Sequence, residues 1–114
     1  HLDNLYAIID RNHLQISGPT EDVMQLEPLK QKWEAFGFYV EQVDGNDMQA
    51  VVKALYKLQT VQRKPKLLLA DTVKGKGVSF MENQTKWHHG GLDDMLYAEA
   101  CEEIARKAEE LRNE

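Results

Sequence analysis

The sequence contains a single cysteine, only three prolines and no long apolar run. Because Cys101 has no second thiol in the chain, neither a disulfide framework nor a cysteine metal site can be proposed, and we expect Cys101 to be a small buried helix residue. No apolar stretch approaches the roughly 20 residues that cross a bilayer. The first residues also lack the charged-then-apolar pattern of a signal segment. We therefore expect no membrane partner and a cytoplasmic location.

Positive charge is scarce as well. The chain has 14 Lys and Arg against 19 Asp and Glu, a net charge of −5, and no basic stripe carries interleaved aromatic residues. Nucleic acid is therefore not expected as a partner. The hydrophobic fraction of 42% is that of an ordinary globular protein. Because the chain opens at "HLDNLYAIID", almost directly in a strand, we interpret residues 1–114 as a single partial domain of a longer protein.

Apolar periodicity alternates between strand and helix along the chain. Short apolar runs such as "LYAIID" favour strands covered on both faces, and apolar residues three and four apart favour helices between them. Helical connections imply parallel strands with right-handed crossovers, so the predicted fold class is an α/β, doubly wound parallel sheet of three or more strands. We predict strands at 5–10, 38–44 and 66–73, helices near 27–36 and 47–60, with Asn46 or Asp47 as the N-cap of the latter, and a terminal amphipathic segment, 93–114, whose helix lies near 93–112.

The loop after the first predicted strand, "DRNHLQISGP", is a candidate binding loop, because ligands of open parallel sheets bind beyond the carboxyl ends of the strands. Asn12 offers a side-chain oxygen directly after the strand, and the Leu14 carbonyl can turn a second oxygen toward the same point. Hard cations such as Mg²⁺ prefer oxygen ligands and often share them with phosphates. From spacing alone two interpretations stay open: half of a metal site, or a turn that Asn12 stabilises.

The second candidate loop runs from Lys74 to Leu92 and shows little periodicity. Loops of this length in compact domains usually serve a function. The glycines of "KGKG" can bring backbone amides close to an anion, but the same stretch also fits a flexible turn. His88 and His89 are interpreted as metal ligands, acid–base groups or phosphate donors, or as exposed histidines without a special role.

Taken together, these motifs are similar to one family. The ordered series "D-x-N-x-L-x-I-x-G-P-T", "W-x-A-F-G", "V-D-G-x-D", "T-V-K-G-K-G-V-S-F-M-E" and "W-H" spans nearly the whole chain. It resembles the later half of the thiamine diphosphate-binding domain of transketolases, and most of all the N-terminal subunit of split, two-chain bacterial transketolases. The series is far more specific than any one of its members.

The resemblance implies roles for four residues of the two loops. Asn12 corresponds to the asparagine whose side-chain oxygen binds Mg²⁺ or Ca²⁺, and Leu14 to the residue whose backbone carbonyl is another metal ligand. Ile16 corresponds to an apolar residue that packs against the rings of thiamine diphosphate. Lys74 stands where the family places an aliphatic cofactor contact, and its stem can still pack there.

The resemblance also implies a histidine that contacts the cofactor diphosphate and helps to manage the substrate's oxygen. His88, which follows Trp87, and His89, which precedes Gly90, both fit this catalytic role, and His88 is favoured. His13 occupies a position that varies in the family, and we interpret it as a loop filler.

The implied activity is the transfer of a two-carbon ketol unit between sugar phosphates, as in the pentose phosphate pathway. The family's Gly-Asp-Gly motif would lie upstream of His1, and its activating glutamate lies on a C-terminal pyrimidine-binding subunit. We therefore expect this fragment to be inactive alone and to need both missing parts, in a dimer or heterotetramer. The alternatives are another thiamine diphosphate enzyme, such as a deoxyxylulose-phosphate synthase or a 2-oxoacid dehydrogenase component, and a non-catalytic interaction module.

Overall fold

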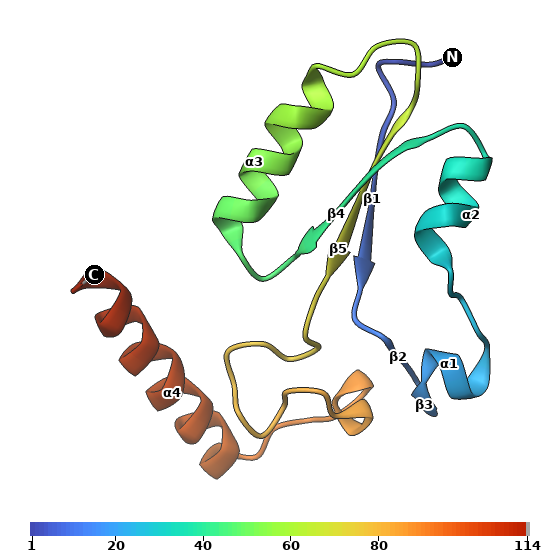
Figure 1. Ribbon diagram of the computed structural model, residues 1–114. Helices are drawn as coiled ribbons and strands as arrows, with labels where there is room; N and C mark the ends of the chain where they lie inside the picture. The colour runs from blue at the N-terminus through green and yellow to red at the C-terminus, as the bar shows by residue number, and fades with distance from the viewer. Residues whose placement is uncertain (114) are drawn as a thin grey trace. The chain divides into compact units, whose positions relative to one another are not determined.

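The structure is a computed structural model that describes residues 1–113, and it divides into two compact units (Figure 1). The first unit comprises residues 1–13 and 19–72, and it contains the main sheet. The second unit comprises residues 14–18 and the chain from Val73 onward, which contains the long loop and the last helix. The interpretation of residues 1–114 as one partial domain stays a prediction.

The first unit is built on three parallel strands in the order β1-β5-β4 (Figure 1). Their bounds are β1 Tyr6–Arg11, β4 Tyr39–Asp44 and β5 Lys66–Asp71. In the register, Asp71 is paired with Arg11 on one side and with Asp44 on the other. All three carboxyl ends therefore lie in one row, as the α/β, parallel fold class requires, and that prediction is confirmed.

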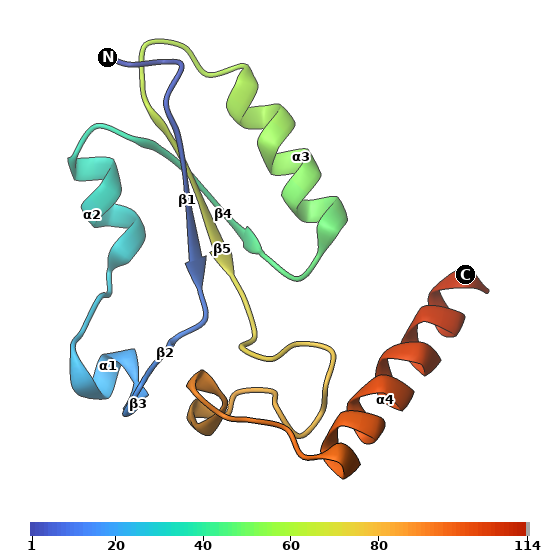
Figure 2. The same ribbon diagram turned by 180° about the vertical axis from the view of Figure 1, so that it is seen from behind.

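Helices α2 (Leu29–Ala35) and α3 (Met48–Gln59) cover opposite faces of this sheet (Figures 1 and 2). Successive leucines of the central strand β5 point to opposite faces, so each face receives part of the run "LLL". Each fully buried leucine side chain contributes about 2 kcal/mol of hydrophobic stabilisation. The α2 face contains Val40, Leu67 and Leu69 with Ala7, Ile9, Leu29, Trp33 and Phe38, and the α3 face contains Ala54, Leu58 and Leu68 with Tyr39, Val43, Val51 and Leu55.

Side-chain caps fix the starts of the two longer helices. The Asp47 carboxylate accepts hydrogen bonds from the amides of Gln49 and Ala50 at 2.9 and 3.1 Å, so Asp47 rather than Asn46 is the N-cap of α3. Asp93 accepts from the Leu96 amide at 2.8 Å and begins α4 (Asp94–Arg112). Both helices therefore start within a residue or two of their predicted positions.

Strand β1 differs from its prediction. Ala7 and Ile9 are partly buried, but Tyr6 and Ile8 are 44% and 63% exposed. The expectation that this strand is covered on both faces is wrong for the described chain, because β1 is an edge strand and the cluster under α3 is built from β4 and β5.

Cys101 also differs from its prediction. It lies in α4 but is exposed, and Tyr97, Ile104 and Leu111 on the predicted apolar face are exposed as well. The buried residue of this helix is Ala100, one position away. Since a helix turns through about 100° per residue, the covered face is displaced from the apolar stripe that the spacing picked out.

Several short elements have no strong sequence signal. β2 (Leu14–Gln15) pairs with β3 (Gly18–Pro19), and α1 (Thr20–Val23) follows. In the long loop, a 3₁₀ helix, η1, covers Thr85–His88. Elements of two to four residues give too few positions for a period to be recognised. Among the described residues, no helix is long and apolar enough to cross a membrane.

Candidate active-site loops

The row of carboxyl strand ends in the first unit is densely hydrogen-bonded. Thr72, directly after β5, donates its hydroxyl to Asp10 at 2.5 Å and its amide to the Arg11 carbonyl at 3.0 Å. On the other side of β5, the Gly45 amide donates to the Asp71 carbonyl at 2.6 Å. These bonds extend the sheet ladder beyond the strands and fix the points from which the loops start.

Asn12 follows β1 directly and is half-buried. The residue before it, Arg11, is only 4% exposed and ties two carboxylates of the following segment. Its Nη2 donates to Glu21 and to Glu27, both at 3.1 Å, and its Nε donates to Glu27 at 3.3 Å. The Leu29 amide, which donates to Glu27 at 2.8 Å, and the Arg11 guanidinium together lower the pKa of Glu27. The chain before Asn12 is therefore held by ion pairs between the buried Arg11 and two partly exposed carboxylates.

His13, directly after Asn12, is connected on two sides. Its backbone lies in the left-handed region with φ of 60°, and its Nε2–H donates to Asp71 Oδ1 at 3.1 Å. Asp71 Oδ2 in turn accepts from the Gln42 amide at 2.7 Å. The His13 carbonyl accepts from the Thr20 amide at 2.9 Å. The interpretation of His13 as a loop filler missed these bonds, because its partner lies 58 residues away in the sequence.

The other predicted site residues belong to the second unit. Leu14 is half-buried in β2, and Ile16, between β2 and β3, is 67% exposed. Lys74 is half-buried, and its carbonyl accepts from the Asn83 amide at 3.0 Å. None of these placements tests the roles that the sequence suggested, which stay predictions.

The "KGKG" loop is ordered by specific contacts, which disfavours the flexible-turn interpretation. A side chain at Gly75 (φ +73°) would approach the Met81 carbonyl oxygen to 2.6 Å, so only glycine fits there. The Gly77 amide donates to Glu82 at 3.1 Å, and its carbonyl accepts from Lys107 of α4 at 3.0 Å.

Helix α4 binds the same loop a second time through Glu103. Ser79 donates to the Glu103 carboxylate from its hydroxyl at 2.5 Å and from its amide at 2.6 Å. These two hydrogen bonds lower the pKa of Glu103. Glu103 and Lys107, one helical turn apart, therefore attach the loop to α4.

His88 and His89 are both exposed, at the end of η1. Their rings lie 4.4 Å apart, edge to face. The preceding Trp87 is anchored, since its indole N–H donates to the Phe80 carbonyl at 3.0 Å and the two rings lie 5.5 Å apart. The two accessible imidazoles therefore follow a tryptophan that is held in place. Both histidines are exposed, so the geometry favours neither as the predicted catalytic histidine.

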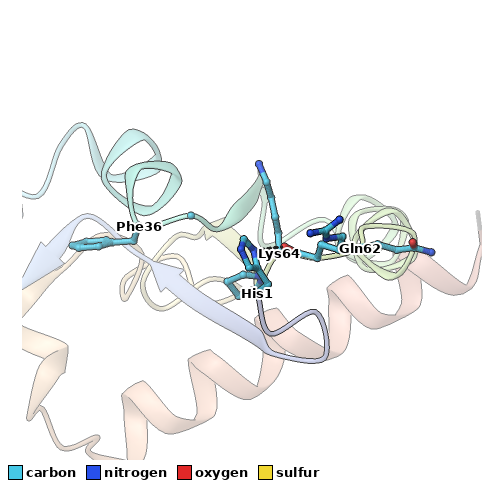
Figure 3. Close-up of a pocket in the computed structure, with 7 residues that line it drawn as sticks. His1, Phe36, Gln62 and Lys64 are labelled. Carbon is cyan, nitrogen blue, oxygen red and sulfur yellow. Dashed lines mark hydrogen bonds between the residues drawn. The ribbon is translucent and has the colours of Figure 1, made fainter.

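A cavity of about 490 Å³ lies elsewhere in the first unit (Figure 3). His1, Phe36, Gln62 and Lys64 line it, and they come from segments that precede β1, β4 and β5. The cavity is therefore at the amino ends of the strands, away from Asn12. Among residues 1–113, no group of three or more His, Cys, Asp or Glu could hold a metal ion.

Comparison with known protein families gives one clear match. The family model described as transketolase, thiamine diphosphate binding domain, matches residues 1–109. An apulose-4-phosphate transketolase subunit from Phocaeicola vulgatus is 47% identical over 113 residues, which cover 99% of this chain and 40% of that protein. The 6-deoxy-6-sulfo-D-fructose transketolase subunit of a Clostridium species is 38% identical over 106 residues, 93% of this chain and 38% of that protein. The chain therefore spans less than half the length of these relatives.

Solved structures agree with this match. A transketolase from Campylobacter jejuni has a TM-score of 0.83 at 32% identity, covering 91% of this chain and 16% of that one. A transketolase from Leishmania mexicana has a TM-score of 0.62 at 24% identity, covering 98% of this chain and 20% of that one. The second likeness concerns the fold alone.

Proposed function

Because the chain belongs to the transketolase family of thiamine diphosphate-binding domains, we propose that its full protein transfers a two-carbon ketol unit between sugar phosphates. The observation that carries this proposal is the family match over residues 1–109, which includes the loops after both β1 and β5. The relative named for apulose 4-phosphate supports a phosphorylated sugar as substrate. A place in the pentose phosphate pathway and a cytoplasmic location belong to the same proposal.

The chain covers 40% and 38% of two relatives, which supports the proposal that the full protein has parts beyond this chain. Both relatives are named as subunits, which supports a dimer or heterotetramer that contains a partner chain. We propose that the remaining cofactor contacts come from those parts. This chain alone is then expected to be inactive.

The metal proposal assigns two oxygen donors to this chain, the Asn12 side chain and the Leu14 backbone carbonyl. Amide and carbonyl oxygens are ligands that Mg²⁺ and Ca²⁺ accept. The described residues offer no cluster of three or more His, Cys, Asp or Glu. The donor set therefore fits part of a site, with further ligands from the diphosphate and from other parts of the protein.

The cofactor proposal assigns contacts to Ile16, Lys74 and one histidine. The exposed side chain of Ile16 is available for an apolar ring, and the half-buried Lys74 can pack through its stem. When bound, thiamine diphosphate supplies the nucleophilic carbon and the electron sink that two-carbon transfer needs. His88 or His89 holds an oxygen of the diphosphate or moves a proton at the substrate's oxygen, for which an accessible imidazole is suited.

The experiment that tests this function is the replacement Asn12→Ala in the full protein assembled with its partner chain. Loss of one oxygen ligand is expected to weaken thiamine diphosphate binding in Mg²⁺ by at least about tenfold. Tryptophan fluorescence or calorimetry measures this affinity, and a ketol-transfer assay measures the activity. The matched control is Asn113→Ala, another amide, which caps the end of α4 and should leave the affinity unchanged. Unchanged affinity for Asn12→Ala would refute the assigned metal ligand.

A further inference from the structure

We propose that His13 is a positioning residue, whose hydrogen bond to Asp71 holds the turn that directs the Asn12 side chain toward the cofactor's metal ion. The inference rests on the proposed function and deepens it. It concerns a residue that the sequence analysis interpreted as a loop filler. His13 itself touches neither the metal nor the cofactor in this proposal.

The first observation is the backbone conformation of His13. Its φ of 60° lies in the left-handed region, which a residue with a Cβ adopts only when surrounding contacts favour it. His13 lies directly after Asn12 and two residues after the buried Arg11. The orientation of the Asn12–His13 peptide therefore depends on what stabilises this unusual conformation.

The second observation is that His13 is held from both its side chain and its backbone. The Nε2–H donates to Asp71 Oδ1 at 3.1 Å. The carbonyl accepts from the Thr20 amide at 2.9 Å and from the Thr20 hydroxyl at 3.3 Å, and Thr20 is 7% exposed. Two anchors on one residue fix both the direction of the side chain and the peptide that follows it.

The third observation is that Asp71 is itself oriented. Its second oxygen accepts from Gln42 at 2.7 Å, so Gln42, Asp71 and His13 form a chain of hydrogen bonds. Gln42 belongs to β4, Asp71 ends β5, and His13 follows β1 after one intervening residue. These hydrogen bonds thus connect all three strands of the sheet. They hold the turn after β1 in place through its contacts with β4 and β5.

The exposure of the His13–Asp71 pair distinguishes an effect on the turn from an effect on the stability of the whole fold. The side chains of His13 and Asp71 are 54% and 34% exposed, and partly exposed pairs contribute little to global stability. Removing the imidazole should therefore leave the fold intact while it loosens the turn. Groups that orient metal ligands from behind change metal affinity when they are lost.

The test uses three substitutions in the full assembled protein. His13→Ala removes the hydrogen bond and disfavours the left-handed turn, His13→Gly removes only the hydrogen bond, and His13→Gln keeps an N–H donor near the position of Nε2. We expect about tenfold weaker binding of Mg²⁺ and thiamine diphosphate for His13→Ala. His13→Gly should remain weakened and His13→Gln should recover most of the affinity. The readouts are calorimetric affinities and hydrogen exchange of residues 12–20 without cofactor.

The matched control is Lys57→Gln, which breaks the Lys57–Glu41 pair (2.7 Å, side chains 58% and 17% exposed) on another part of the first unit. It should leave cofactor affinity unchanged. The double variant His13→Ala/Asp71→Ala should bind no more weakly than the worse of its single variants, because each substitution alone already removes the bond between the two side chains. Additive losses would overturn the inference.

A parallel measurement on Asn12→Ala separates the two proposals. If Asn12→Ala weakens binding and neither His13→Ala nor His13→Gly does, the positioning role is wrong and the proposed function stands. If Asn12→Ala has no effect, the assigned metal ligand is wrong and the positioning role falls with it. If all three variants weaken binding and His13→Gln recovers it, both proposals are supported.

Discussion

The two ends of the same parallel sheet differ in what they offer. The amino ends of the strands border a cavity of about 490 Å³, lined in part by the basic side chains of Arg63 and Lys64. The carboxyl ends instead carry polar side chains that are bonded to one another across all three strands. Open parallel sheets bind ligands beyond their carboxyl ends. The comparison teaches that the two ends can be distinguished by chemistry: the carboxyl ends carry mutually oriented polar groups and the amino ends border an empty volume.

The buried Arg11 gives the largest expected stability difference between the two ends. Arg11→Met leaves Glu21 and Glu27 without their shared cation, at a cost of about 2 kcal/mol. The cost is below that of a fully buried pair because the two carboxylates are 39% and 48% exposed. Denaturant unfolding of the full protein measures it, and hydrogen exchange should show residues 20–28 loosened. Arg63→Met at the amino end is the matched control, with an expected change within about 0.5 kcal/mol. Equal losses at both ends would remove the distinction.

Two glycines, one at each end of the sheet, give a smaller expected difference in stability. At the carboxyl end, a Cβ on Gly45 would lie 2.6 Å from Thr72 Cγ2 and 2.8 Å from Ala70 Cβ, so Gly45→Ala should cost about 2 kcal/mol through overpacking. At the amino end, Gly37 has open space but φ of +91°, so Gly37→Ala should cost about 1 kcal/mol through backbone strain.

The glycine pair also separates stability from binding. Gly45→Ala displaces Thr72 beside Asp10 and should weaken cofactor affinity, whereas Gly37→Ala should leave it unchanged. Thermal unfolding and calorimetry of the same samples measure the two effects. Weakened binding for Gly37→Ala alone would indicate that the amino-end cavity is the functional one.

The smallest expected effect is the contribution of Glu27 to the pH dependence of folding stability. The Leu29 amide and Arg11 lower its pKa below the usual value of 4.5, so the ionised carboxylate stabilises the folded state. This stabilisation is complete above pH 4.5 and is lost as the pH falls through the lowered pKa of the folded state. Because the side chain is 48% exposed, the contribution is below about 1 kcal/mol. Glu27→Gln should flatten the acid limb of a stability–pH curve, and an unchanged limb would contradict this assignment.

The sequence predicted the frame of the first unit because local signals sufficed there. The apolar runs placed the three strands, and helical spacing with the Asp47 cap placed α3. The strand predicted at 66–73 ends at Asp71, although Thr72 still bonds to Asp10 and Arg11 of the neighbouring strand. Boundaries of this kind depend on tertiary contacts that a period cannot contain.

The bonds that orient the candidate site could not be predicted in the same way. Asp71 lies 58 residues from His13 and 29 from Gln42, and only the register of three strands brings them together. The error at Cys101 has the same origin, because spacing defines an apolar stripe but not the surface that covers it. Roles by resemblance were assigned to six residues, and these roles stay predictions: Asn12, Leu14, Ile16, Lys74, His88 and His89.

The exposed sulfur of Cys101 has a practical consequence. It is the sole thiol of this sequence, so a maleimide dye would attach to this chain at one point, on α4 beside Tyr97, without any engineering. The emission colour of such a dye depends on local polarity. A blue shift on mixing with a proposed partner chain would report, in real time, that the side of α4 that carries Cys101 has become covered.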